Sequence, residues 1–125
     1  IFQHGVYVQH QKSYAFDACI PIIRKLGIRE TQLLRIQANC LLPNEKPYYS
    51  DWHTDFPDEE NQLKFNTAVY HLSTNNGATE FKDGTIVKSE QNSLAEFTGT
   101  LLHRSKSQTD TKRRIILNFN YLLDD

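Results

Sequence analysis

Short apolar segments separated by turn residues fill the chain from residue 31 onward. LLRIQANCLL, FNTAVYHLS, SLAEF and RRIILNFNYLL are such segments, and PNEKP, NNGA, KDG and TGT stand between them. Segments of this length that are bounded by Gly, Pro, Asn and Asp are typical of strands joined by tight turns. KDG, between TEF and TIV, predicts a hairpin. The pattern as a whole predicts an antiparallel sandwich or barrel.

One amphipathic helix is expected before this region. Residues 13–26, SYAFDACIPIIRKL, carry apolar side chains at helical spacing and are followed by Gly27. Ser13 is placed to cap the first turn, and Pro21 predicts a kink or a new start. We expect this helix to pack on the sheet and to have no functional role of its own.

The length of the chain, 125 residues, allows one core and is too short for two independent ones. We therefore expect a single domain over residues 1–125, with a helical part at about 13–26 and the barrel at about 31–123.

Charge argues against a nucleic-acid partner, and the cysteine spacing indicates the state of the thiols. The formal net charge of −1 gives no broad basic field for a nucleic-acid backbone, so nucleic acid is not an expected partner. Residues 57–62, PDEENQ, are expected to form a solvated loop whose carboxylates would repel phosphates. Cys19 and Cys40 lack CxxC spacing, which favours reduced thiols over a zinc knuckle or a disulfide.

No apolar run approaches the roughly 20 residues of a membrane span, and residue 1 does not open a signal peptide. These two observations predict a soluble, cytoplasmic protein.

A histidine and an aspartate stand one residue apart in YYSDWHTDF, residues 48–56. Alternate residues of a strand share a face, so His53 and Asp55 would point together and could take adjacent positions on a divalent metal ion. His103, in TGTLLHRS, is the best candidate for a third ligand. Two histidines and one carboxylate suit a non-haem Fe(II) oxygenase, but catalytic zinc sites also use three protein ligands. The residues alone leave the metal open.

The other histidines are expected to lie outside this site. His4 and His10, near the beginning of the chain, are expected to be ordinary hydrogen-bonding residues, and His71 is expected to face away from the site.

An arginine begins the last apolar segment, ten residues after His103. Arg113 shares one strand face with Ile115, Leu117 and Phe119, and Arg114 shares the other face with Ile116, Asn118 and Asn120. The first face is apolar apart from its arginine, which favours Arg113 as the inward residue. A buried guanidinium needs an anion, and its planar fork suits a carboxylate. A bulge or a one-residue slip would instead turn Arg114 inward.

HxD, a distal histidine and a following arginine together resemble the motif set of the Fe(II)- and 2-oxoglutarate-dependent dioxygenases. The segment from Tyr49 to Asp55, with VYHLS, GATEF and EFTGTLLHRS, resembles the prolyl-4-hydroxylase-like branch of that superfamily. The resemblance extends over roughly residues 33–122.

The resemblance implies a mainly β fold, a double-stranded β-helix or cupin-like jelly-roll barrel, with the N-terminal helix buttressing one sheet. It implies that His53, Asp55 and His103 are catalytic ligands of Fe(II), and that Arg113 and the Tyr70 hydroxyl bind the 5-carboxylate of 2-oxoglutarate. The expected activity consumes O2, converts 2-oxoglutarate to succinate and CO2, and hydroxylates a substrate, with ascorbate as a reductant.

The substrate is left open between a small molecule and a peptidyl side chain, and the shortness of the loops favours an accessible site. The oligomeric state is open too. Two alternatives also stay open. One is a cupin-like metalloprotein that does not use 2-oxoglutarate, although cupins resemble HxH with a following glutamate. The other is a non-catalytic jelly-roll binding module.

Overall fold

The structure, a computed structural model, describes residues 2–55 and 64–123. The acidic loop expected at 57–62 lies outside the described residues. The strands of the described chain are β1 (Phe2–Val8), β2 (Gln11–Lys12), β3 (Leu33–Leu41), β4 (Phe65–His71), β5 (Ala78–Phe81), β6 (Ile86–Lys88), β7 (Ser93–Thr98), β8 (His103–Lys106) and β9 (Arg114–Leu122). A 3-10 helix, η1 (Glu30–Gln32), precedes β3.

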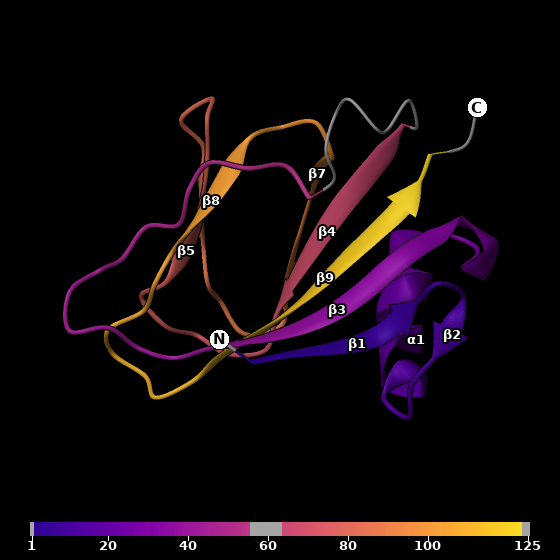
Figure 1. Cartoon of the computed structure of the whole chain (residues 1–125), viewed down its shortest axis with the longest axis horizontal. Coiled ribbons are helices and arrows are strands. Elements are labelled where there is room, and N and C mark those ends of the chain that lie inside the picture. Colours follow the sequence, from indigo (N-terminus) through magenta and orange to yellow (C-terminus); the bar gives the residue numbers. More distant parts are fainter. Residues whose placement is uncertain (1, 56–63, 124–125) are drawn as a thin grey trace.

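The strands form two antiparallel sheets that face each other across the interior (Figure 1). The larger sheet has the order β2-β1-β3-β9-β4-β7, and the smaller sheet has the order β6-β5-β8. Isolated bridges from Tyr49 to Lys106 and from His53 to His103 place the segment 49–53 along the free side of β8. This is a jelly-roll fold, as the pattern of strands and turns predicted. The predicted KDG hairpin joins β5 to β6.

The helix α1 (Phe16–Leu26) covers the outer face of the larger sheet, on the side away from β5 and β8 (Figure 1). It continues through Pro21 and ends at Gly27, whose left-handed φ of 71° suits glycine. The main hydrophobic core lies between α1 and this sheet, where Cys19 of the helix joins Ile36 and Phe119 of the strands. The prediction of a helix that buttresses the sheet is therefore confirmed.

The position of α1 decides which sheet face is apolar. Because the helix covers the outside, Phe119 is fully buried in the core beneath it, with Leu117 packed against that core. The face turned toward the smaller sheet instead carries polar side chains, including Asn118 and Asn120 of β9. The expectation that the apolar set of β9 points into the barrel was wrong, because the core lies outside the barrel and the barrel interior encloses a polar cavity.

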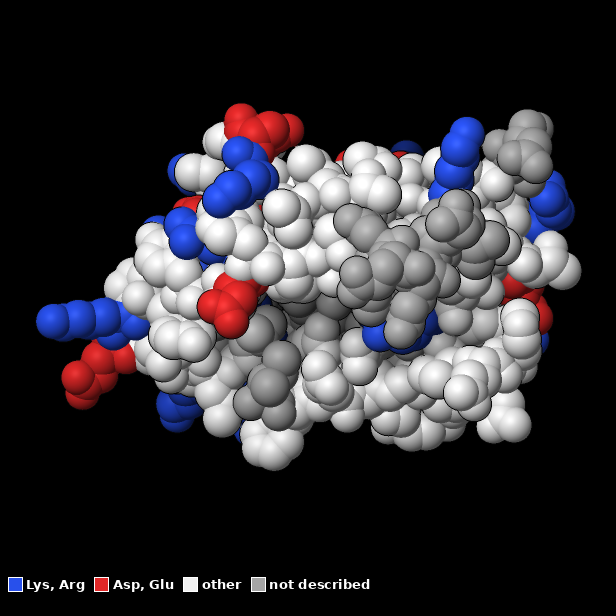
Figure 2. Space-filling view, turned by 45° about the horizontal axis from the view of Figure 1, so that its top comes forward, with Lys and Arg blue, Asp and Glu red and all other residues white. Residues whose placement is uncertain are grey.

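Cys19 and Cys40 are both free, as expected. Among the described residues, no helix combines the length and the apolar character that crossing a bilayer requires. On the face in Figure 2, basic and acidic side chains are interspersed and do not gather into one charged field.

Candidate metal and anion site

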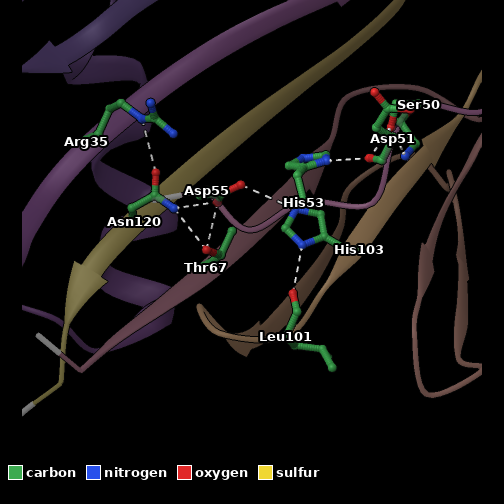
Figure 3. Close-up of polar contacts among 10 residues, drawn as sticks. Arg35, Ser50, Asp51, His53, Asp55, Thr67, Leu101, His103 and Asn120 are labelled. Atoms are coloured by element: carbon green, nitrogen blue, oxygen red, sulfur yellow. Dashed lines mark hydrogen bonds and ion pairs between the residues drawn. The ribbon is translucent and has the colours of Figure 1, made fainter. Parts of the chain in front are cut away.

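Side chains from two distant parts of the chain lie close together in Figure 3, those of His53 and Asp55 from one and that of His103 from the other. His53 lies in the bridge to β8, Asp55 follows at a bend, and His103 is the first residue of β8. Each offers one ligand atom, and these atoms all lie within 4.8 Å of one another. The bridge from His53 to His103 brings the two histidines together, because two backbone hydrogen bonds of 3.0 Å join these residues. The predicted triad therefore assembles, although its first two members lie on an isolated bridge and not on a regular strand.

Backbone carbonyls orient both imidazole rings. Nδ1 of His53 lies 2.8 Å from the carbonyl oxygen of Asp51, and Nδ1 of His103 lies 3.0 Å from that of Leu101. A carbonyl oxygen can only accept, so Nδ1 is the protonated nitrogen in each ring and donates to it. This leaves Nε2 as the atom for a metal in both rings. Such outer hydrogen bonds fix the tautomer and orientation of histidine ligands.

Two hydrogen bonds hold one oxygen of the Asp55 carboxylate. Oδ2 accepts from the side-chain amide of Asn120 at 2.7 Å and from the hydroxyl of Thr67 at 2.9 Å. Asn120 also donates to the Thr67 hydroxyl at 2.9 Å, and its own oxygen accepts from Arg35 Nε at 3.2 Å. The other oxygen, Oδ1, lies 3.3 Å from Nε2 of His103. The carboxylate is thus fixed with one oxygen presented to the two histidines.

The ionisation of the triad follows from these contacts. Burial alone would raise the pKa of Asp55, but hydrogen bonds from His103, Asn120 and Thr67 outweigh it and lower the pKa to about 2. Burial alone would lower the pKa of His103, but its hydrogen bonds to Asp55 and to the Leu101 carbonyl outweigh it and raise the pKa. A metal at the triad would compete with a proton for Nε2 of His103, so metal binding would favour release of that proton.

Arg104 links the residues just before His53 to the smaller sheet through stacking and hydrogen bonds. The Arg104 guanidinium lies 4.4 Å from the ring centre of Tyr49 and 4.5 Å from that of Trp52. It also donates twice to Glu80, at 2.8 and 3.0 Å. These contacts hold the residues just before His53 against β5 and β8.

A cavity of about 330 Å³ extends from the triad between the two sheets. Its walls include Val69 of β4, Thr79 of β5, Ser105 of β8 and Ile116 of β9, and Arg35 lies on the same wall as Asn118. The cavity is large enough for a small organic anion.

A buried arginine lies beside this cavity. Arg114 has no exposed surface, and its Nη1 donates to the carbonyl of Lys106 at 2.9 Å and to the hydroxyl of Ser105 at 3.3 Å. Its Nε and Nη2 have no hydrogen-bond partner among the residues that the structure describes. Burial lowers the pKa of Arg114 to about 10, so the side chain stays charged at neutral pH. A fully buried cation with two unused donors is the physical mark of an anion site.

A histidine lies on the same face. His71 is fully buried, and neither of its ring nitrogens has a hydrogen-bond partner within the described part of the chain. Burial, and then the positive charge of Arg114, lower its pKa to about 4.

Three expectations about individual residues need correction. Arg113 is exposed on the outer face and Arg114 is the inward arginine, so the predicted register of β9 was off by one residue. Tyr70 packs against the core on the α1 side and its hydroxyl donates to Asn92 at 2.8 Å, away from the cavity. His71, expected to face away from the site, lies on the inner face.

Sequence reasoning did not find the two residues that hold Asp55. Thr67 shares the inner face of β4 with Val69 and His71, because alternate residues of a strand point the same way. Asn120 shares the inner face of β9 with Arg114 for the same reason. The polar residues at alternate positions of both strands were the available signal. Because the apolar face of β9 was assigned to the barrel interior, Asn120 was placed on the opposite face.

The donor set fits a divalent transition metal. Two imidazole Nε2 atoms and one carboxylate oxygen on one side of a metal suit non-haem Fe(II), and a catalytic zinc ion uses ligands of the same kinds. The orphaned donors of Arg114 and His71 add a separate place for an anion in the same interior.

Solved structures share this fold at low sequence identity. An oxidoreductase of the 2OG-Fe(II) oxygenase family from Burkholderia pseudomallei is similar with a TM-score of 0.65 and 12% identity, over 98% of this chain and 73% of that one. A viral collagen prolyl hydroxylase from Paramecium Bursaria Chlorella virus-1 is similar with a TM-score of 0.62 and 14% identity, over 97% of this chain and 75% of that one.

An RmlC-like cupin protein from Desulfovibrio desulfuricans is similar with a TM-score of 0.51 and 10% identity, over 75% of this chain and 76% of that one. No protein-family model matches the chain, and no curated protein matches its sequence. The structural similarities establish the jelly-roll fold, which these oxygenases and cupins share.

Proposed function

We propose that the chain is an Fe(II)- and 2-oxoglutarate-dependent dioxygenase that hydroxylates an organic substrate, releasing succinate and CO2. One observation carries the proposal: the His53, Asp55 and His103 triad and the buried cation Arg114 belong to the same interior, between the two sheets. A molecule with a chelating 2-keto acid at one end and a carboxylate at the other matches this pair of sites. 2-Oxoglutarate is such a molecule.

In this proposal, Nε2 of both histidines and Oδ1 of Asp55 would hold the metal. When bound, Fe(II) would supply the oxidising chemistry with dioxygen, and ascorbate would serve as the reductant that keeps it ferrous. Asn120 and Thr67 keep Oδ2 occupied, so the carboxylate offers a single oxygen and leaves positions open for the keto acid.

Arg114 takes the binding role that the sequence interpretation gave to Arg113, because Arg114 is buried on the inner face and Arg113 is exposed. A guanidinium with Nε and Nη2 unused can accept a carboxylate with two parallel hydrogen bonds. Ser105, already bonded to Arg114, fixes the fork from the other side. The low polarity of Val69 and Ile116 on the cavity wall helps to exclude water from this end.

An anaerobic titration of the Fe(II)-loaded protein with 2-oxoglutarate tests the proposal. Chelation should produce a weak visible charge-transfer band in the wild type, and the band should be absent from Asp55→Ala, which lacks the carboxylate ligand. Bound iron without a band would instead favour a cupin-like metalloprotein that does not use 2-oxoglutarate. A wild type that binds no metal would favour a non-catalytic binding module.

Either a small molecule or a peptidyl side chain is compatible with the proposal as the substrate.

A further inference from the structure

His71 and Arg114 form a buried pair in which most of the side-chain nitrogens lack a hydrogen-bond partner within the described part of the chain. Both are fully buried, and four of their nitrogens, namely both of His71 and Nε and Nη2 of Arg114, have no partner among the described residues. Polar groups removed from water without a partner cost free energy, and native proteins leave few of them. With the His71 ring neutral, three of these four nitrogens carry N–H groups and one accepts, so the pair as a whole suits a ligand that accepts hydrogen bonds.

The two residues are diagonal neighbours on the inner face. His71 is the last residue of β4 and pairs with Ile116 of β9, and Arg114 precedes Ile116 by two positions. Residues in this relation lie on one face within reach of long side chains. Ile116 and Val69, the next residues toward the triad on this face of each strand, both line the cavity. A ligand in the cavity therefore has the pair at its far end.

The electrostatic environment of His71 is simple. Its partner across β9 is Ile116 and its partner across β7 is Ser93, and neither side chain titrates in the accessible range. Arg114 is the charged group that acts on the ring among the described residues. With burial and this cation both opposing protonation, the pKa of about 4 keeps the ring neutral at pH 7 in the ligand-free protein.

We propose that His71 takes up a proton from solvent when the distal carboxylate of 2-oxoglutarate binds to Arg114. The inference rests on the proposed function, because it needs a dicarboxylate ligand in this cavity. Burial, and then the positive charge of Arg114, hold the ring neutral. The arriving carboxylate offsets that charge. It also brings the acceptor atoms that the N–H groups of an imidazolium require. The bound carboxylate is then held by a guanidinium and an imidazolium together.

A dependence of affinity on pH follows, with a definite sign. The bound state holds one more proton than the free state at pH values between the pKa of free His71, about 4, and its higher pKa in the complex. Within that window, affinity for 2-oxoglutarate falls by up to about tenfold for each unit of rising pH. Above the pKa of the complex, the dependence disappears.

Calorimetric titration tests the proposal with Mn(II)-loaded protein, which avoids oxidation. The heat of 2-oxoglutarate binding, measured near neutral pH in buffers of different ionisation enthalpy, gives the number of protons taken up. The wild type should take up as much as about one proton per ligand, depending on the pH. Pyruvate keeps the 2-keto acid but lacks the distal carboxylate, so its binding should take up none.

Two variants locate the proton. His71→Gln has a side chain of similar length that donates a hydrogen bond but cannot be protonated, so it should bind 2-oxoglutarate with no proton uptake and with affinity nearly independent of pH. His10→Gln is the control, because His10 is exposed and bonds to the Tyr7 hydroxyl, and it should keep the wild-type uptake.

The outcomes separate the two proposals. Binding of 2-oxoglutarate to the wild type without proton uptake, or uptake unchanged in His71→Gln, would overturn the role of His71 and leave the dioxygenase proposal standing. No binding of 2-oxoglutarate to the wild type at any pH would overturn both. If His71→Gln does not fold, 15N shifts of the His71 ring in the wild type decide. They should move to imidazolium values on addition of 2-oxoglutarate, and unchanged shifts would refute the proposal.

Discussion

The two ends of the interior differ in how completely their polar atoms are paired. At the metal end, Nδ1 of both histidines and Oδ2 of Asp55 have hydrogen-bond partners that orient these side chains. The other ligand atoms, Nε2 of each histidine and Oδ1 of Asp55, are directed at the place for a metal. At the anion end, Arg114 and His71 are buried with four nitrogens unpaired among the described residues. The metal end is therefore organised before its ligand arrives, whereas the anion end is completed by its ligand.

The two ends also differ in how the stability of the ligand-free fold relates to ligand binding. The hydrogen bonds around Asp55 favour the folded state and the metal together. The buried charge of Arg114 costs folding free energy that its hydrogen bonds to Ser105 and Lys106 offset in part, and a bound anion would offset more of it. Substitutions at the two ends should therefore change stability in opposite directions.

The largest expected effect is loss of the metal from Asp55→Ala. Two histidines alone hold a divalent ion weakly, so the variant should show no saturable Co(II) absorption at concentrations that saturate the wild type. Its fold, followed by circular dichroism, should be retained. Wild-type affinity in this variant would remove Asp55 from the metal site.

Asn120→Ala should weaken metal binding by about 10- to 100-fold, the usual effect of removing an outer partner of a ligand. The physical reason is that Oδ2 of Asp55 loses its shorter hydrogen bond and keeps only the one from Thr67, so the carboxylate is less firmly oriented. Competition titration with a chelating dye measures the change. Asn118→Ala is the matched control, since Asn118 shares the face and the cavity wall, and equal losses in the two variants would argue against a specific role for Asn120.

Arg114→Met should abolish the preference for 2-oxoglutarate over pyruvate and yet raise the free energy of unfolding of the ligand-free protein by about 1 kcal/mol or more. Methionine fills similar space without a buried charge. Urea denaturation measures the stability, and Arg113→Met, at the exposed neighbour, should change it by less than about 0.5 kcal/mol. A strongly destabilised Arg114→Met protein would mean that the arginine is a structural residue satisfied by its contacts with Ser105 and Lys106.

The smallest expected effect is that of Tyr70→Phe. Its hydroxyl bonds to Asn92 on the α1 side of the sheet, so its removal should leave the affinity for 2-oxoglutarate within about twofold of wild type. A large loss, measured in the same titration as the wild type, would restore Tyr70 to the anion site and contradict the observed strand face.

The fold class and the three residues of the triad could be predicted from the sequence because both depend on local signals. Turn residues separate the strands, HxD places two ligands together, and His103 follows a glycine turn. The face of β9 could not be assigned in the same way. Alternation identifies two sets of residues on a strand but does not say which set faces the core. In this protein α1 covers the outer face, so the apolar set belongs outside and Arg114 points inward.

The partners of Asp55 depend on tertiary pairing and were beyond reach for the same reason. Asn120 and Thr67 are adjacent because β9 pairs with β4 in the register Thr67 to Asn120. No feature of either segment alone indicates that register.

A crystal structure of the protein with Mn(II) and 2-oxoglutarate would test the central claim, that one ligand joins the two ends, most directly. We predict Mn(II) bound by Nε2 of His53, Oδ1 of Asp55 and Nε2 of His103, with the distal carboxylate in hydrogen-bond contact with Nε or Nη2 of Arg114. Metal at the triad with the carboxylate bound elsewhere, for instance at Arg35 on the cavity wall, would contradict it.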